Sequence, residues 1–152
     1  MDNLKLDRDL KELRIEKSLY KANTLSYYFV LLAIILNGVF LIQSLNVMDK
    51  TFDVGLVILF NIFISLLLFL GAVRLKIYAK NWTYIVAGVG IIQFIRSIFY
   101  IPENASGSQV TKFVLLLVFS AILLLAAAAY AYRKVILQES YKAKHLEDKA
   151  RR

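Results

Sequence analysis

The sequence predicts an all-helical integral membrane protein in which four transmembrane helices, joined by short loops, form an up-down bundle. The 152-residue chain is 59% hydrophobic and 20% charged, whereas soluble domains are usually about 45–50% apolar and about a quarter charged. The apolar residues gather in four blocks, and nearly every charge lies outside them. The chain also has one proline and no cysteine, which excludes a disulfide-stapled secreted domain.

Each apolar block is long enough to cross about 30 Å of hydrocarbon, for which a helix needs roughly 20 apolar residues. Buried helices of a soluble core are the alternative, but 152 residues cannot supply enough polar chain to cover four of them. The first block is too long for a cleaved signal peptide and lacks its small-residue cleavage motif, so we expect a retained anchor. The expected spans are 25–45, 54–73, 83–101 and 113–132, within a transmembrane domain of residues 25–132.

Charged segments flank the four spans. Residues 1–24 carry Leu6, Leu10 and Leu13 at helical spacing, which indicates a charged helical extension. Two interpretations stay open for it, a solvated helix or a docking helix for a cytoplasmic partner or the membrane surface. Residues 133–152 are expected to form a basic cytoplasmic tail.

The distribution of Lys and Arg predicts how the chain is oriented, because cytoplasmic loops carry an excess of both. The two terminal segments and the loop between spans two and three hold 16 of them, whereas the other two loops hold only Lys50 and Lys112. With four spans, the three basic regions fall on one side, so both termini are expected in the cytoplasm. The net charge of +8 then belongs to the cytoplasmic face, where it favours anionic lipid headgroups rather than nucleic acid.

Four polar side chains lie at one depth in the four spans. Asn37, Asn61, Gln93 and Ser120 are each seven or eight residues inward from the outer boundary, or about 10–12 Å at 1.5 Å per residue. Polar groups at this depth must find partners away from lipid. We therefore expect a polar layer inside the bundle.

Arg96 is the one charge within a span, and it lies one helical turn outward from Gln93 on a face that Ser97 and Tyr100 continue. Three interpretations stay open. The layer fixes helix register through interhelical hydrogen bonds of about 0.6 kcal/mol each. Alternatively, Arg96 snorkels to the surface and pairs with an acidic residue, or it binds an anionic ligand, lipid or partner in an outward-facing cavity. The acidic candidates are Asp49, Asp53 and Glu103.

Small residues predict where two of the helices approach most closely. Ala87, Gly88 and Gly90 lie in the inner half of span three, and Ala127 and Ala131 lie in the inner half of span four. Because lipid provides no hydrophobic drive between helices, their association depends on close backbone contact. We expect spans three and four to be closest near the cytoplasmic face, although packing against a second copy fits these residues equally well.

Absent residue types narrow the function. The chain has no cysteine, and its spans contain no His, Asp or Glu, so thiolate, haem, metal and carboxylate-coupled chemistry lack their usual groups. We therefore expect no enzyme activity, cofactor or metal. The leading hypothesis is a non-catalytic subunit, adaptor or assembly factor of a larger membrane complex, in the bacterial inner membrane by default. The alternatives are a small oligomeric pore or carrier for an anionic or neutral solute, and a lipid-binding or immunity-type membrane protein.

Overall fold

The computed structural model describes residues 10, 13–14, 21–48, 52–100 and 105–150, and for 52–53 and 144–150 it describes the backbone alone. Within these ranges the chain forms long helices and no strand. Most of the helical extension expected at 1–24 lies outside the described residues, and so do Asp49 and Glu103. The long helices are α2 (Thr24–Leu45), α3 (Phe52–Lys76), α4 (Lys80–Phe99) and α5 (Gly107–Ala150).

All four helices are long and apolar enough to cross a membrane. The fold is therefore that of a multi-pass helical membrane protein. At the carboxyl end, α5 extends beyond the expected span 113–132 and continues through the residues expected to form the basic tail as far as Ala150. It continues because residues 133–150 contain neither proline nor glycine, the two residues that most often end a helix.

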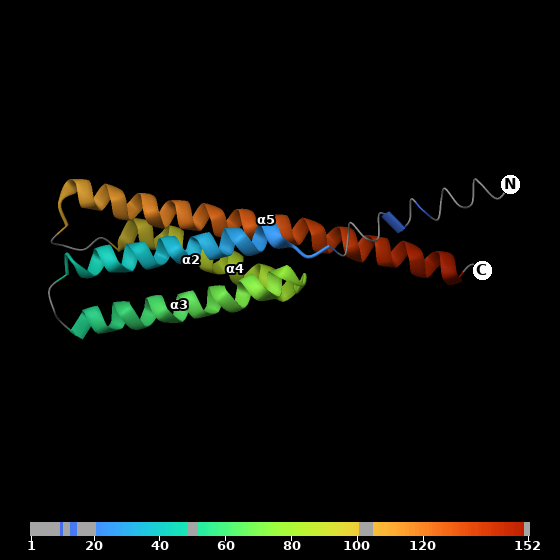
Figure 1. The fold of residues 1–152 in the computed structure, drawn as a ribbon, viewed down its shortest axis with the longest axis horizontal. Coiled ribbons are helices and arrows are strands. Elements are labelled where there is room, and N and C mark those ends of the chain that lie inside the picture. The colour runs from blue at the N-terminus through green and yellow to red at the C-terminus, as the bar shows by residue number, and fades with distance from the viewer. Residues whose placement is uncertain (1–9, 11–12, 15–20, 49–51, 101–104, 151–152) are drawn as a thin grey trace.

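The bundle has two ends, which we name by the helix termini found there. The distal end holds the carboxyl end of α2 and the start of α5, and the proximal end holds the start of α2 and the carboxyl end of α3 (Figure 1). At the proximal end the Asn23 N–H donates to the Lys76 carbonyl at 3.1 Å. Figure 1 shows α5 continuing well past this end, beyond the other three helices.

The helices contact one another unequally. The contact between α4 and α5 is the most extensive, those of α2 with α5 and α3 are next, and that of α3 with α4 is smaller than these three. The main core gathers small and aliphatic side chains from all four helices, such as Ala33, Leu68, Val86 and Ala127. A second, aromatic core contains Phe40, Phe113 and Leu117 at the distal end.

The turn between α3 and α4 ends α3 with a Schellman motif. The Ala79 N–H donates to the Arg74 carbonyl at 3.1 Å, and the Tyr78 N–H donates to the Leu75 carbonyl at 3.2 Å. This motif places one residue in the left-handed region, usually glycine, and here it is Tyr78 with φ of 60°. The Tyr78 hydroxyl donates to the Lys21 carbonyl, so the tyrosine also ties this turn to the segment that precedes α2.

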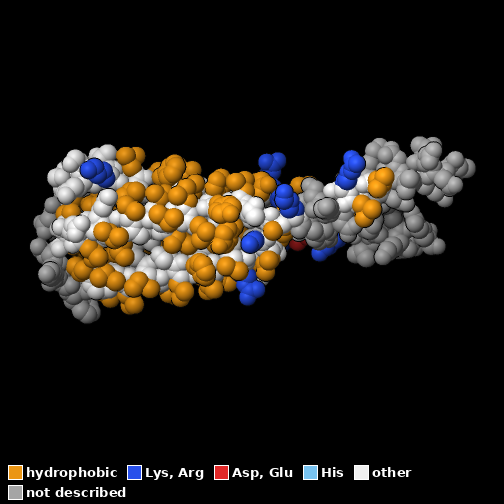
Figure 2. Space-filling model, viewed as in Figure 1, with side chains coloured by type: hydrophobic (Ala, Val, Ile, Leu, Met, Phe, Trp, Pro, Cys, Tyr) orange, Lys and Arg blue, Asp and Glu red, His pale blue; other side chains and the backbone are white. Residues whose placement is uncertain are grey.

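The surface matches a protein surrounded by lipid. Hydrophobic side chains cover the bundle along its length, whereas most of the Lys and Arg visible on this face lie at or beyond the proximal end (Figure 2). Large apolar residues such as Ile35, Phe63 and Leu115 are more than half exposed. In water such an apolar surface would drive aggregation, whereas in a bilayer it faces acyl chains.

Candidate functional site

The polar residues expected at one depth are buried inside the bundle. Asn37 on α2, Asn61 on α3, Gln93 on α4 and Ser120 on α5 are each at most 1% exposed. Their burial follows from the cost of exposing amide and hydroxyl groups to hydrocarbon. The structure therefore supports an internal polar layer, and its hydrogen bonds show which members act together.

Gln93 lies at the centre of this layer because both ends of its amide are used. Its Nε2 donates to Asn37 Oδ1 at 2.9 Å, and its Oε1 accepts from Arg96 Nη1 at 3.0 Å. Asn37 in turn donates from Nδ2 to Ser65 Oγ at 3.2 Å. One continuous chain of hydrogen bonds thus joins α4 to α2 and α2 to α3.

Arg96 turns inward and binds Asn61 as well as Gln93. Its Nη1 and Nη2 both lie 3.3 Å from Asn61 Oδ1, while Asn61 Nδ2 donates to the Val57 carbonyl one turn earlier at 2.7 Å. Only 9% of Arg96 is exposed. This geometry differs from the snorkelling interpretation, because the guanidinium finds its partners on α3 and α4 rather than at the surface.

Three aromatic rings enclose the Arg96 guanidinium. Its Cζ lies 5.1 Å from the ring centroids of Phe40 and Phe60 and 5.6 Å from that of Tyr100. The negative faces of such rings attract a cation, most strongly where water is excluded. Within the described ranges no carboxylate forms an ion pair with Arg96, so the rings and amide oxygens stabilise its charge. Of the acidic candidates, Asp49, Glu103 and the Asp53 side chain lie outside those ranges.

Two of the predicted site residues, Ser120 and Ser97, form their hydrogen bonds elsewhere, and a third, Tyr100, contacts Arg96 through its ring. Ser120 Oγ donates to the Ala33 carbonyl at 3.3 Å, which links α5 to α2. Ser97 Oγ donates to the Phe94 carbonyl of its own helix at 2.6 Å. Tyr100 contributes its ring to Arg96, while its hydroxyl lies 3.5 Å from Met48 Sδ. Of the four residues of equal depth, Asn37, Asn61 and Gln93 thus belong to one amide network across three helices, whereas Ser120 forms a separate hydrogen bond between α5 and α2.

The small residues expected at a helix contact divide into two groups. Gly90, Ala127 and Ala131 are buried, and a Cβ at Gly90 would lie 3.2 Å from Leu124 Cβ on α5. Ala87 is partly buried against the main core. A Cβ at Gly88 would meet no heavy atom within 4 Å, so Gly88 makes no close helix contact, because it lies two positions from Gly90 and helix neighbours on one face are three or four apart.

A second polar cluster lies at the proximal end, where the sequence predicted no site. Asn23 caps α2 by accepting from the Ser26 N–H at 3.2 Å, and its Nδ2 donates to Ser26 Oγ at 2.8 Å. Ser26 Oγ donates to the Ala127 carbonyl of α5 at 3.0 Å. The Asn-x-x-Ser pattern before an apolar run was a signal for this cap, but the link to α5 needed the tertiary structure.

Arg96 also forms part of the wall of a groove between α3 and α4. The groove has a volume of about 250 Å³ and is lined by Leu56, Val57, Phe60, Arg96 and Tyr100. Its surface is apolar almost throughout, so the Arg96 donors face Asn61 and Gln93 rather than the groove. This arrangement favours a scaffold role for the polar network over binding of an anion from the groove.

The fold and the buried network define the class of protein as a multi-pass helical membrane protein with an internal amide–guanidinium network. In the part of the chain that the structure describes, no cluster of three or more His, Cys, Asp or Glu side chains is placed to hold a metal. No known protein family, curated protein or solved structure matches the chain.

Proposed function

We propose that this protein is a non-catalytic membrane protein that acts as a subunit, adaptor or assembly factor of a larger membrane complex. The observation that carries the proposal is the length of α5, which is one helix of 44 residues. At 1.5 Å per residue it is about 66 Å long, whereas about 30 Å of hydrocarbon needs roughly 20 residues. The part of α5 beyond the expected span, residues 133–150, is the α5 extension, and it is therefore available to a partner outside the membrane.

Contacts at Val135 and Glu139 help to attach this extension to the bundle. Val135 is 5% exposed at the proximal end of the bundle, and Lys80 Nζ at the start of α4 lies 2.9 Å from Glu139 Oε1 on α5. Ile136 and Leu137 on the same stretch are about half exposed. A helix held in this way keeps a bound partner at a defined distance and rotation from the membrane domain, which is what an adaptor requires.

Both termini are proposed to lie in the cytoplasm, with the helices in up-down order. The support is the distribution of Lys and Arg, of which 16 flank the proposed cytoplasmic side and two the opposite side. The α5 extension would then meet cytoplasmic proteins or the cytoplasmic ends of other membrane proteins.

An oligomeric pore or carrier has less support. A pathway for a solute needs polar groups that face an open channel, whereas Asn37, Gln93 and Arg96 are buried and bound to one another. The third interpretation, a lipid-binding or immunity-type protein, is compatible with the adaptor function and depends on lipid contacts at the surface.

Copurification from native membranes tests the proposed function. The tagged full-length chain is compared with a truncated chain that ends at Leu137, and bound proteins are identified by mass spectrometry after extraction in mild detergent. We expect a stoichiometric membrane-complex partner with the full chain and its loss with the truncated chain.

A matched control separates the extension from the ion pair that truncation also removes. The full-length Glu139→Gln variant loses only the solvent-exposed pair with Lys80, which stabilises little because water screens it, and it should retain the partner. The proposal fails if the full chain copurifies with no other protein, or if the truncated chain keeps every partner and its helical circular dichroism.

A further inference from the structure

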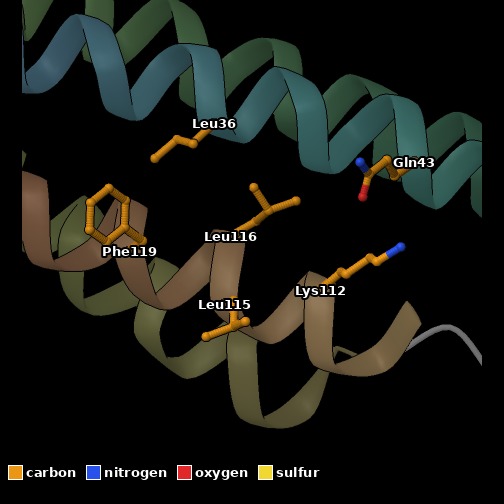
Figure 3. A pocket seen from close by; sticks show the side chains of 6 residues that line it. All are labelled: Leu36, Gln43, Lys112, Leu115, Leu116 and Phe119. Atoms are coloured by element: carbon orange, nitrogen blue, oxygen red, sulfur yellow. The ribbon is translucent and has the colours of Figure 1, made fainter. Parts of the chain in front are cut away.

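A second groove lies between α2 and α5 at the distal end of the bundle. Its volume is about 350 Å³. Figure 3 shows Gln43 of α2 and Lys112 of α5 at the same end of this groove, with Leu36 and Phe119 at the other end. The groove is lined by Leu36, Gln43, Lys112, Leu115, Leu116 and Phe119.

The groove extends from the membrane boundary into the hydrocarbon. Gln43 is two residues before the end of α2, and Lys112 is five residues after the start of α5. Leu36 and Phe119 are each seven residues further into their helices, or about 10 Å deeper at 1.5 Å per residue. One end of the groove is therefore polar at headgroup depth, while the remainder is apolar and surrounded by acyl chains.

The polar end has hydrogen-bond donors without partners in the described part of the chain. Lys112 is exposed and pairs with no carboxylate there, and the Gln43 amide, which is partly buried, makes no hydrogen bond there. A lysine carries three N–H donors and a fixed positive charge, and a glutamine amide carries two donors. These two side chains therefore attract an anion with several acceptor oxygens.

We propose that this groove binds an anionic phospholipid of the surrounding bilayer. One acyl chain lies along Leu36, Leu116 and Phe119, because hydrocarbon is what can fill an apolar groove at that depth. The phosphate lies at the boundary, where Lys112 supplies a positive charge and the Gln43 amide donates a hydrogen bond. The site selects by charge at Lys112 and by shape along the apolar part, independently of the α5 extension.

The test measures lipid binding by native mass spectrometry on the full-length protein in mild detergent, titrated with phosphatidylglycerol or with phosphatidylcholine. We expect the wild type to prefer phosphatidylglycerol. Lys112→Gln should weaken phosphatidylglycerol binding about fivefold and leave phosphatidylcholine binding unchanged, while Lys112→Arg should keep the preference because it keeps the charge.

Two further variants keep the result interpretable. Lys76→Gln removes one exposed charge at the proximal end and should leave the lipid preference as in the wild type, with circular dichroism confirming the fold of each variant. Leu36→Trp fills the apolar part and should weaken binding of both lipids.

Two outcomes would overturn the proposal. The first is an equal loss with Lys112→Gln and Lys76→Gln, which would mean general surface attraction. The second is unchanged binding of both lipids by Leu36→Trp. If the wild type is a dimer and this variant is then a monomer, the groove is an interface between copies of the chain.

Discussion

Arg96 is a buried cation whose described surroundings contain rings and amides rather than a carboxylate. Phe40 and Phe60 each lie 5.1 Å from its Cζ, and the side-chain oxygens of Asn61 and Gln93 accept its hydrogen bonds. A charge within a membrane is costly unless such groups compensate it. Phe40 lies on α2, Phe60 and Asn61 lie on α3, and Gln93 lies on α4 with the arginine itself. Arg96 therefore helps to hold these three helices in one register.

Replacing Gln93 by leucine should destabilise the protein by about 1–2 kcal/mol. The substitution removes one hydrogen bond between helices, to Asn37, and one within α4, from Arg96. Asn37 Oδ1 and one Arg96 N–H would then be buried without their partner. Reversible unfolding in mixed detergent micelles, monitored by circular dichroism, measures the difference.

Gln43→Leu is the matched control for this substitution. Gln43 is partly buried and makes no hydrogen bond within the described ranges, so the same chemical change should alter the free energy of unfolding by much less. Equal effects of the two substitutions would mean that the Gln93 network contributes nothing beyond the polarity of a glutamine in a membrane helix.

At the scale of the helices, glycines decide where a side chain of one helix can pack against the backbone of the next. A Cβ at Gly71 of α3 would lie 2.7 Å from Val86 Cγ2 of α4, and Val86 is fully buried. The α3–α4 contact is the smallest between adjacent helices, yet it holds the tightest glycine position. The sequence predicted helix contacts at Gly90 and Gly88 but not at Gly71, because composition alone does not show which glycine faces a bulky neighbour.

Gly71→Ala is therefore expected to destabilise the bundle by about 1–3 kcal/mol through overpacking against Val86. The opposite sign is expected for Gly88→Ala, where open space lets the better helix propensity of alanine add up to about 1 kcal/mol. The two variants are compared by their thermal midpoints in one detergent. A lower midpoint for Gly88→Ala, or an unchanged one for Gly71→Ala, would contradict this description of the helix contacts.

The whole molecule combines an apolar bundle with a helix that continues past its proximal end (Figure 1). Hydrophobic side chains cover the bundle, and basic side chains gather at and beyond the proximal end (Figure 2). Together with the excess of Lys and Arg at the proposed cytoplasmic side, this asymmetry leads to a prediction about orientation.

The absence of cysteine makes single-cysteine labelling a direct test of that orientation. Ser108 and Ser140 are both exposed, one near the start of α5 and one in its extension. A membrane-impermeant maleimide should label the Ser108→Cys variant in intact cells and the Ser140→Cys variant only after the membrane is broken. The reverse pattern would place the α5 extension outside the cytoplasm and exclude a cytoplasmic partner for it.

Particular residues show how far the sequence could predict the site. Burial of Asn37, Asn61 and Gln93 followed from their depth, since a polar group in hydrocarbon must turn inward. Depth could not show that Ser120 would bind the Ala33 carbonyl instead of joining them, because this depends on how α5 is rotated against α2. Ser65 and Ser26 were missed for the same reason, since a serine in an apolar run carries no sign of its partner.

The sequence by itself determined the class of protein. Four apolar runs that contain a single charge, Arg96, leave few alternatives to membrane-spanning helices, because the cost of placing polar groups in lipid is large and local. Only the tertiary structure decided the inward turn of Arg96, the close approach at Gly71 and the groove at Lys112. These features depend on the rotation and spacing of one helix against another, and the small energies that set them leave no regular pattern along the chain.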